Sequence, residues 1–423
     1  MAYFTHVFPR RLAIAQKFVS LFDDDIPIQF SAYDGSRAGL LDTENTLEIN
    51  SEIALRYILS HANDLGLARA YIMGHLEIRG NLYETLMATA VHLKKPAPIA
   101  SLAKLAFAIG PRAVIRPELP TEEAPPRYRR GILHSLSRDK QAIAHHYDIS
   151  NDFYSLILGP TMVYSCGIFA SNGATLEQAQ TEKMDLICRK LDLKPGRRLL
   201  DIGCGWGALV RHAAREYGVR AVGITLSQNQ LEFARQRVAA EGLSAQVEIR
   251  LQDYRKVPDR EFDAVSSVGM SEHVGESKLN LYFSQLATRI KDDGRILNHC
   301  ITRPNALMRA KAEAFIDRYI FPDGELSGPS RVVAALHDSG LELRHSENIR
   351  EHYTKTLEKW CGNLTDNWDA AVAEVGLRRA RIWLLYMNLS RIGFATNQIQ
   401  VHQFLGVANF ANGQNTMSLR NNF

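Results

Sequence analysis

The spacing of apolar and polar residues changes near residue 140 of this 423-residue chain. Beyond that point, short runs of consecutive apolar residues alternate with stretches in which apolar residues recur every three or four positions. The first pattern is typical of buried strands and the second of amphipathic helices. This alternation predicts an α/β domain with a parallel, doubly wound sheet, whose ligands bind beyond the carboxyl ends of the strands.

The expected strands of this domain are the stretches 197–207 (ending in a glycine-rich turn), 219–227, 245–254, 262–270 and 295–302, with helices at 208–218 and 228–243. Before residue 115 the pattern is mixed. A strand and turn are expected at 26–36, helical spacing begins after a cap at Asn50–Ser51 and runs through 50–80, and another helix is expected at 82–95. This part predicts a smaller α+β domain without a catalytic constellation.

Prolines gather between the two patterns, at Pro117, Pro120, Pro125 and Pro126. Proline disfavours both helix and sheet, so a domain boundary is expected here. The predicted organisation is therefore an N-terminal domain at 1–115, a linker at 116–138 and a catalytic domain at 139–423.

Composition narrows the possible partners and compartments. The formal net charge of +4 is mildly basic and suits an anionic partner. Strong basic faces and base-stacking motifs are not evident, so no nucleic-acid partner is expected. Five scattered cysteines without a C-x-x-C pair predict neither a metal site nor a disulfide scaffold, and they fit a reducing cytoplasm. The N-terminus does not read as a signal peptide, and no apolar run has the length of a membrane span.

The strongest local signal is LLDIGCGWG at 199–207, a strand followed by alternating glycines. Glycine permits a tight turn and close approach of a ligand to the backbone. The pattern D-x-G-x-G-x-G, beginning at Asp201, differs from the G-x-G-x-x-G of dinucleotide sites and is typical of S-adenosylmethionine sites. The second strand ends in Thr225, Ser227 and Gln230, whose hydroxyls and amide can bind a ribose, and Asp253 is expected to face the adenine amino group.

Six motifs occur in an order that resembles one family: HYDISNDFYSLILGPTMVYSCGIF (146–169), LLDIGCGWGALV, GITLSQNQ, GMSEHVG, FIDRYIFPDGELS (315–327) and HYTKTLEKW (352–360). Together they resemble the cyclopropane-fatty-acyl-phospholipid synthases, with the mycolic acid cyclopropane synthases and fatty-acid C-methyltransferases. The resemblance implies a Rossmann-like S-adenosylmethionine-dependent methyltransferase domain with a smaller N-terminal α+β domain. It implies transfer of a methylene group from S-adenosylmethionine to the double bond of an unsaturated phospholipid acyl chain, forming a cyclopropane.

Carried over residue by residue, the resemblance implies two sets of site residues. The cofactor-binding set is Tyr164, Ser165, Asp201, Gly203, Gly205, Thr225, Leu226, Ser227, Gln230, Gln252 and Asp253. The second set would hold a bicarbonate ion that removes a proton from the carbocation left on the chain, and it is Cys166, Glu272, His299, Ile301 (through its backbone) and Tyr353. Glu272 is expected to orient and tune this base, whereas His273 is expected to be structural.

A lipid substrate implies docking on the inner face of a membrane, without a spanning segment. The basic and apolar stretches 92–116 and 127–138 are candidates for this contact, although 100–109 also reads as a core helix. A homodimer is expected because two chains on one surface gain avidity.

Two alternatives remain at this stage. A fatty-acid C-methyltransferase would give a methyl-branched or methylene product through the same cation, and departures from the family's common pattern at Ser271, at HCIT (299–302) and at GFATNQIQ (393–400) leave that open. A lipid-binding protein with a silent catalytic domain is disfavoured by the presence of Asp201, Glu272, His299 and Tyr353.

Overall fold

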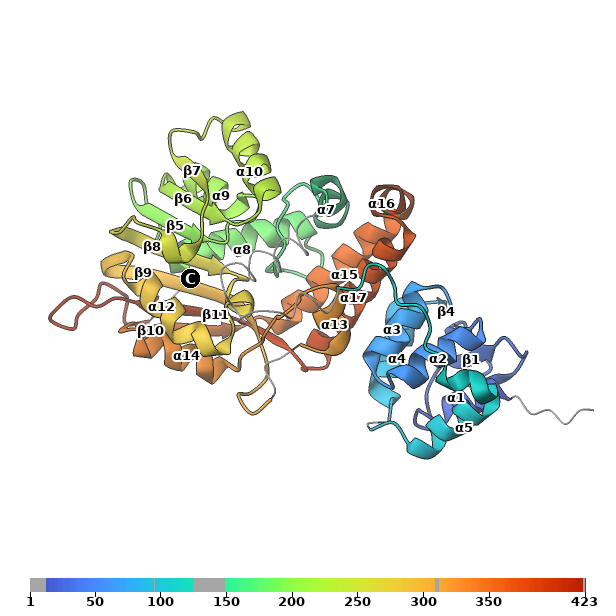
Figure 1. Cartoon of the computed structure of the whole chain (residues 1–423). Helices are drawn as coiled ribbons and strands as arrows, with labels where there is room; N and C mark the ends of the chain where they lie inside the picture. Colours follow the sequence, from blue (N-terminus) through green and yellow to red (C-terminus); the bar gives the residue numbers. More distant parts are fainter. Residues whose placement is uncertain (1–12, 95, 125–148, 309–311, 421–422) are drawn as a thin grey trace, which may run out of the picture. The chain divides into compact units, whose positions relative to one another are not determined.

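The computed structural model describes residues 13–94, 96–124, 149–308, 312–420 and 423 (Figure 1). The chain divides into two compact units. The first unit comprises the chain up to Glu123 with Glu313–Tyr319 and Gly376–Ile392, and the second unit comprises Ala124–Ala312, Ile320–Val375 and Gly393–Phe423. Among the described residues, no helix combines the length and apolar character needed to cross a bilayer.

A seven-stranded sheet forms the centre of the second unit, in the order β10-β11-β9-β8-β5-β6-β7. Its strands are β5 (Arg198–Ile202), β6 (Arg220–Thr225), β7 (Val247–Leu251), β8 (Phe262–Val268), β9 (Ile290–Thr302), β10 (Glu342–Asn348) and β11 (Gln400–Val407). Strands β5 to β9 are mutually parallel, as the alternating pattern predicts. β11 and β10 extend the sheet in antiparallel fashion beyond β9, so the sheet is mixed rather than wholly parallel.

Helices cover both faces of this sheet because neighbouring strand residues point to opposite sides. Leu199 packs in the core beneath α8 (Leu176–Lys190), α9 (Ala208–Tyr217) and α10 (Gln228–Ala240). Leu200 packs in the opposite core, with α12 (Leu279–Ala287) and α14 (Pro329–Asp338). The described part of this unit also contains the helical segments α7 (Asn151–Leu158), η3 (Tyr254–Lys256), α11 (Ser271–Val274), η4 (Glu276–Lys278), α15 (Arg350–Asp366) and α16 (Trp368–Val375).

The order of strands places a switch point at β5. The chain goes from β5 to β6 on one side, and later returns to β8 on the other side of β5. The connections diverge there and leave a crevice at the carboxyl ends of the strands, where α/β sheets bind their ligands. The glycine-rich turn after β5 lies at this crevice.

The first unit has a four-stranded sheet in the order β2-β1-β3-β4. Its strands are β1 (Gln29–Ala32), β2 (Arg37–Gly39), β3 (Thr46–Ile49) and β4 (Leu76–Arg79). Its helices are α1 (Ile14–Val19), α2 (Glu52–Ser60), α3 (Asp64–Ile72), α4 (Leu82–His92), α5 (Ile99–Ile109), η1 (Gly110–Val114), α13 (Ala314–Tyr319) and all but the last turn of α17 (Leu377–Ala395). The stretch 50–80 is therefore two helices and a strand, since Asn63 accepts a hydrogen bond from the Leu65 N–H and starts a new helix.

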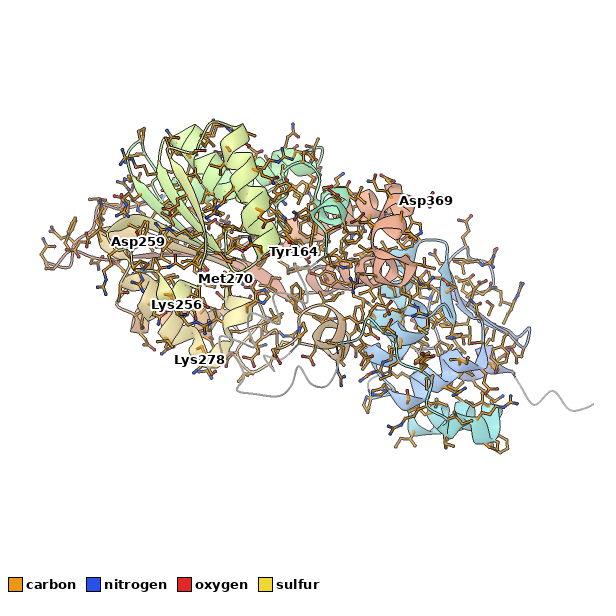
Figure 2. All side chains as sticks on the ribbon, turned by 45° about the horizontal axis from the view of Figure 1, so that its top comes forward. Tyr164, Lys256, Asp259, Met270, Lys278 and Asp369 are labelled. Atoms are coloured by element: carbon orange, nitrogen blue, oxygen red, sulfur yellow. The ribbon has the colours of Figure 1, made fainter. Side chains whose placement is uncertain are left out.

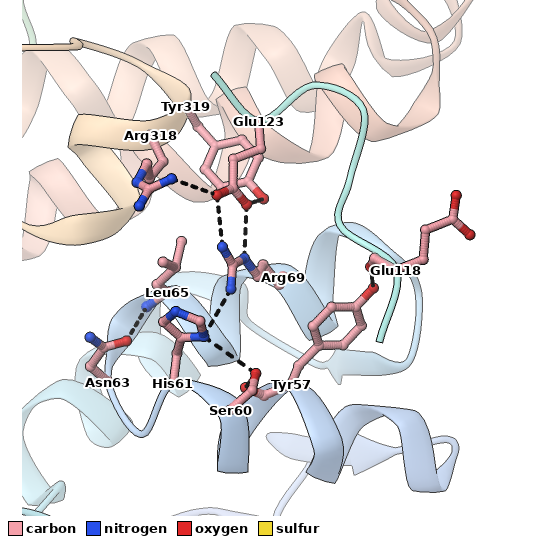
Figure 3. A network of polar contacts seen from close by, with 10 residues as sticks. All are labelled: Tyr57, Ser60, His61, Asn63, Leu65, Arg69, Glu118, Glu123, Arg318 and Tyr319. Carbon is pink, nitrogen blue, oxygen red and sulfur yellow. Dashed lines mark hydrogen bonds and ion pairs between the residues drawn. The ribbon is translucent and has the colours of Figure 1, made fainter. Parts of the chain in front are cut away.

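A buried ionic network ties distant segments of the chain into the first unit (Figure 3). Arg69 on α3 donates two hydrogen bonds, of 2.7 and 2.8 Å, to the carboxylate of Glu123. Arg318 and Tyr319 on α13 contact the same carboxylate. Thus Glu123, in the segment expected to be a linker, anchors this unit, and 313–319 and most of α17 join it although both were expected in the catalytic domain. Residues 125–138 of the expected linker lie outside the described residues.

Candidate active site

The turn after β5 is built from glycines with left-handed backbone conformations. Gly203, Gly205 and Gly207 have φ angles of +75°, +54° and +79°. A side chain at Gly203 would also meet the Met270 side chain, because its Cβ would lie 2.6 Å from Met270 Cγ and Sδ. Gly207 then caps α9, which starts at Ala208. The local sequence therefore forms a tight turn that leaves the backbone open to a ligand.

A pocket of about 140 Å³ lies against this turn. Tyr164 and Met270 both line this pocket although they lie far apart in the sequence, and both are labelled in Figure 2. All of the predicted cofactor-binding residues except Ser227 and Asp253 line the pocket, namely Tyr164, Ser165, Asp201, Gly203, Gly205, Thr225, Leu226, Gln230 and Gln252. Residues far apart in the sequence are thus brought to one cavity.

The end of β6 is held in place by a short hydrogen-bond chain. The Thr225 hydroxyl donates to Gln230 Oε1 at 2.7 Å, and Ser227 caps α10 by accepting from the Gln230 N–H. Ser227 therefore orders the pocket wall from outside the pocket. Thr225 and Gln230 present their polar groups at the position expected for ribose binding.

Asp253 follows β7 and contacts a neighbouring arginine. Its carboxylate makes an ion pair with Arg255 at 2.7 Å and accepts from the Arg255 backbone N–H, capping η3. It does not line the pocket, whose wall after β7 is formed by Gln252 and Tyr254. Its assignment to the adenine amino group stays a prediction.

Asp201 is buried on β5 beneath the glycine turn. Its carboxylate accepts a hydrogen bond of 2.6 Å from the Ser266 hydroxyl on β8. Burial raises the pKa of Asp201 to about 6, against the opposing effects of this hydrogen bond and of Lys183. The pair links the two strands on either side of the switch point.

Lys183 is a pocket residue that the sequence reasoning missed. It comes from α8, is 3% exposed, and donates a hydrogen bond of 2.7 Å to the Ser165 hydroxyl. Burial lowers the pKa of Lys183 to about 8. A signal was present in the sequence, because Lys183 falls on the apolar stripe of an amphipathic helix, four residues after Ala179 and four before Ile187.

Glu272 emerges after β8, as expected for a residue at the carboxyl edge. Its Oε1 accepts a hydrogen bond of 2.7 Å from the backbone N–H of Ile301 on β9. Its Oε2 is buried and has no hydrogen-bond partner among the described residues. Burial raises the pKa of Glu272 to about 7. The N–H of Ile301 thus holds Glu272, and the expected contact of the Ile301 backbone with an ion stays a prediction.

His299 lies on β9 and is 2% exposed. Its Nδ1 lies 3.3 Å from Nε2 of Gln403 on β11, and its Nε2 is buried without a hydrogen-bond partner among the described residues. Burial lowers the pKa of His299 to about 3, so the ring is neutral at physiological pH. Two buried polar atoms of the predicted ion-binding set, Glu272 Oε2 and His299 Nε2, therefore have no hydrogen-bond partner among the described residues.

The other members of that set lie around α15. Cys166 is fully buried, with its Sγ 3.8 Å from the Ile349 carbonyl at the start of α15. Burial raises the pKa of the Cys166 thiol above its usual range, which favours the protonated form. Tyr353, in the first turn of α15, stacks on Phe394 with ring centroids 4.4 Å apart.

Further pocket residues that were not predicted as site residues include Trp206, Tyr254, Met270 and His273. His273 follows Glu272 in the sequence and lines the pocket. The structural role expected for it stays a prediction. Trp206 donates from its indole nitrogen to Asn151 at 2.7 Å, so the motif around residue 150 supports the glycine turn.

Comparison with known proteins identifies the family of this chain. The family model described as mycolic acid cyclopropane synthetase matches residues 134–404. A probable fatty acid methyltransferase of Mycobacterium tuberculosis is 45% identical over 403 residues, covering 93% of this chain and 94% of that protein. A probable fatty acid methyltransferase of Pseudomonas putida is 38% identical, with 93% and 94% covered.

Solved structures give the same family. The cyclopropane synthase MmaA2 of M. tuberculosis has a TM-score of 0.60 and 31% identity, covering 66% of this chain and all of that chain. The mycolic acid cyclopropane synthase CmaA1, solved in complex with SAH and CTAB, has a TM-score of 0.60 and 31% identity over 63% of this chain and 98% of that one. These matches confirm the resemblance and the Rossmann-like fold. The chain therefore belongs to the mycolic acid cyclopropane synthetase family, and within it is an S-adenosylmethionine-dependent methyltransferase.

Proposed function

We propose that this protein transfers the activated carbon of S-adenosylmethionine to the double bond of an unsaturated phospholipid acyl chain. The observation that carries the proposal is the pair of buried atoms Glu272 Oε2 and His299 Nε2, which lack partners among the described residues; Glu272 precedes the pocket-lining His273, and His299 pairs in the sheet with the pocket-lining Val268. An alkene has no proton to lose before it attacks a methyl group, so attack leaves a positive charge on the acyl chain. The site then needs a proton acceptor positioned to act after the transfer.

The pocket residues fit the donor in their chemistry. S-adenosylmethionine supplies an electrophilic methyl group when it is bound. The turn at Gly203 and Gly205 admits close approach to the backbone, and Thr225 and Gln230 offer hydrogen bonds for a ribose. We assign Lys183 to the carboxylate of the donor's amino-acid end, since it is a buried cation with a hydroxyl as its hydrogen-bonding partner at the pocket wall.

A bicarbonate ion fits the second set of residues. It would supply a proton acceptor beside the reacting carbon. Glu272 Oε2 accepts hydrogen bonds when it is ionised, and a buried imidazole nitrogen such as His299 Nε2 requires a partner. Glu272 and His299 would hold the ion, with Cys166, Tyr353 and the Ile301 backbone as the remaining members of the set. The raised pKa of Glu272, at about 7, lets a proton be shared with a neighbouring anion.

Depletion of bicarbonate tests this assignment directly. Glu272→Gln and His299→Ala should each lower turnover. The expected loss of transition-state stabilisation is about 2–4 kcal/mol for each variant, which is the range for a charge-stabilising group. Added bicarbonate should partly restore turnover in the weaker variant and in Tyr353→Phe, while S-adenosylmethionine affinity stays unchanged by calorimetry. Normal turnover in bicarbonate-free buffer for parent and variants alike would refute the role.

The proton that is removed decides the product. Loss of a proton from the newly added methyl group closes a cyclopropane, the product expected from the family resemblance. A 1,2-hydride shift that moves the charge to the methyl-bearing carbon, followed by loss of a proton from the methyl group, gives a methylene branch, and loss of a proton from a neighbouring chain carbon gives a methyl-branched alkene. The second product is favoured by the relatives at 45% and 38% identity over almost the full chain, which are named as probable fatty acid methyltransferases.

One experiment separates the two products. The purified protein is incubated with S-adenosylmethionine and vesicles of an unsaturated phospholipid, and the released fatty acids are analysed by NMR. A ring and a methylene branch have the same mass, so mass alone does not distinguish them. Cyclopropane signals support the first candidate, olefinic methylene signals support the second, and an unmodified chain would contradict both.

We propose further that α5 docks this protein on an anionic membrane surface. The helix buries Ser101, Leu105 and Ile109 on one side and exposes Ile99 and Phe107, which are 84% and 77% exposed, on the other. Lys104 on the same helix and Arg112 on the following η1 are exposed, and Arg112 pairs with Glu52. Apolar anchors among cations suit an anionic lipid surface. The other expected docking stretch, 127–138, lies outside the described residues.

Vesicle flotation tests this surface. The double variant Ile99→Glu and Phe107→Glu should lose binding to anionic vesicles, and Leu281→Glu on α12, whose side chain is 50% exposed, is the control. Equal binding by the parent and the double variant would remove α5 from the contact. A cytoplasmic, membrane-peripheral location and a homodimer belong to the same proposal, and sedimentation measures the dimer.

A further inference from the structure

The antiparallel register of β9 and β11 places His299 opposite Gln403. Gln403 is 1% exposed, and both of its amide atoms are engaged. Its Oε1 accepts a hydrogen bond of 2.7 Å from Nζ of Lys190, which projects from the end of α8 and is fully buried. Its Nε2 lies 3.3 Å from His299 Nδ1. Two successive side-chain contacts thus connect Lys190 through Gln403 to His299.

Lys190 determines the orientation of the Gln403 amide. An ammonium group is a donor only, so the amide atom that faces Lys190 must be the oxygen. Glu347 holds Lys190 in place through an ion pair of 2.6 Å. The Gln403 NH₂ group is thereby directed at His299.

The orientation of Gln403 in turn determines the proton position on His299. An NH₂ group only donates, so His299 Nδ1 must accept and carries no proton. Neutral imidazole has one N–H, which must then be on Nε2. Nε2 is the atom left without a partner among the described residues. We propose that Lys190 and Gln403 are positioning residues that fix His299 as the Nε2–H tautomer, and so make it a hydrogen-bond donor toward the proton acceptor of the reaction.

The tautomer of His299 follows from these contacts alone. The role of its Nε2–H group as a donor toward the proton acceptor rests on the proposed function. An anion or other acceptor held by Glu272 and His299 needs a donor on the histidine side, because an ionised Glu272 offers only acceptor atoms. With the opposite tautomer, two acceptors would face each other in a buried site. The contacts of Lys190 and Gln403 disfavour that tautomer of His299.

Nitrogen NMR of the full-length protein labelled with ¹⁵N-histidine tests the proton position, with His299→Ala assigning the signal. We expect the protonated, pyrrole-type nitrogen of His299 to be Nε2 at neutral pH. Gln403→Glu keeps the shape but offers His299 only acceptor atoms, so the proton should move to Nδ1. Gln400→Glu makes the same change on β11 at a residue bonded to Asn397 instead, and should leave the signal in place.

Turnover should fall about 10- to 100-fold in Gln403→Glu, the range for losing a partner that orients a functional histidine, with S-adenosylmethionine affinity unchanged. Lys190→Met frees the amide to rotate and should give mixed tautomers with a smaller loss. A wild-type spectrum with the proton on Nδ1, or an unmoved proton in Gln403→Glu, would overturn the inference. If the proton moves while turnover is normal, the tautomer assignment stands and the proposed donor role of His299 fails.

Discussion

The two oxygens of Glu272 meet different surroundings: Oε1 is held by the Ile301 N–H, while Oε2 is buried without a partner among the described residues. Because burial raises the pKa of Glu272 from 4.5 to about 7, the folded protein binds this proton more tightly than the unfolded chain does. Between those two pH values the folded state therefore carries more protons, and its stability falls as the pH rises.

This sign gives a prediction about stability. In bicarbonate-free buffer, the parent should lose up to about 3 kcal/mol of unfolding free energy between pH 5 and pH 8 relative to Glu272→Gln, which has no proton to lose. Urea unfolding at both pH values, followed by tryptophan fluorescence, measures the difference. Parallel pH dependence in the two proteins would show that Glu272 titrates as it would in water.

Lys183 gives a second prediction, for donor binding. Lys183→Met removes the buried cation while keeping the length of the side chain, so S-adenosylmethionine affinity should fall by about 1.5–3 kcal/mol, the range for a hydrogen bond to a charged group. Since the pKa of Lys183 is lowered to about 8, affinity in the parent should also decline as the pH rises above that value. Calorimetry measures both effects, and Lys194→Met, at an exposed lysine, should match the parent. Unchanged affinity in Lys183→Met would exclude it from the donor site.

At the scale of elements, the strand–turn–helix unit from β5 to α9 determines the shape of the donor pocket. A side chain at Gly203 would change the pocket indirectly, because the new Cβ would displace the Met270 side chain, which itself lines the pocket. The left-handed backbone at Gly203 adds strain of its own.

A matched pair of glycines separates these two effects. Gly242 also has a left-handed φ, of +70°, but its Cβ would meet nothing within 4 Å. Gly203→Ala and Gly242→Ala should each lose about 1 kcal/mol of stability from backbone strain, measured by chemical denaturation. Only Gly203→Ala should weaken S-adenosylmethionine binding by calorimetry. Equal affinity in both variants would show that Met270 adapts without changing the pocket.

The elements of the second unit could be predicted because their cause is local. Period-two and period-3.6 apolar patterns follow from which face of a strand or helix is buried, and the glycines after β5 mark a turn with few alternatives. The partnership of His299 with Gln403 was not predictable in this way. It depends on the register of β11 against β9, two strands separated by about a hundred residues and set by packing of the whole sheet.

At the scale of the whole chain, Glu123 joins α3 to α13 within the first unit (Figure 3). Glu123→Gln leaves the Arg69 guanidinium buried without its counter-charge, which should cost about 3–5 kcal/mol. Hydrogen exchange measured by mass spectrometry should then speed up in 313–319 and 376–392 as well as in α3, while β5 to β8 stay protected. Glu122→Gln, at the half-buried neighbouring residue, is the control. Exchange confined to the residues around 123 would contradict the division into these two units.

The sequence by itself determined the catalytic fold, the donor loop and the family, since these depend on patterns and motifs within short stretches around Asp201, Glu272 and His299. Tertiary structure alone decided which segments complete the first unit, that Lys183 enters the pocket, that Asp253 pairs with Arg255, and that Ile301 holds Glu272. The physical reason is the range of the interactions. Backbone preference and apolar periodicity act between near neighbours in the chain, whereas buried charges find their partners only after the strands and helices have packed.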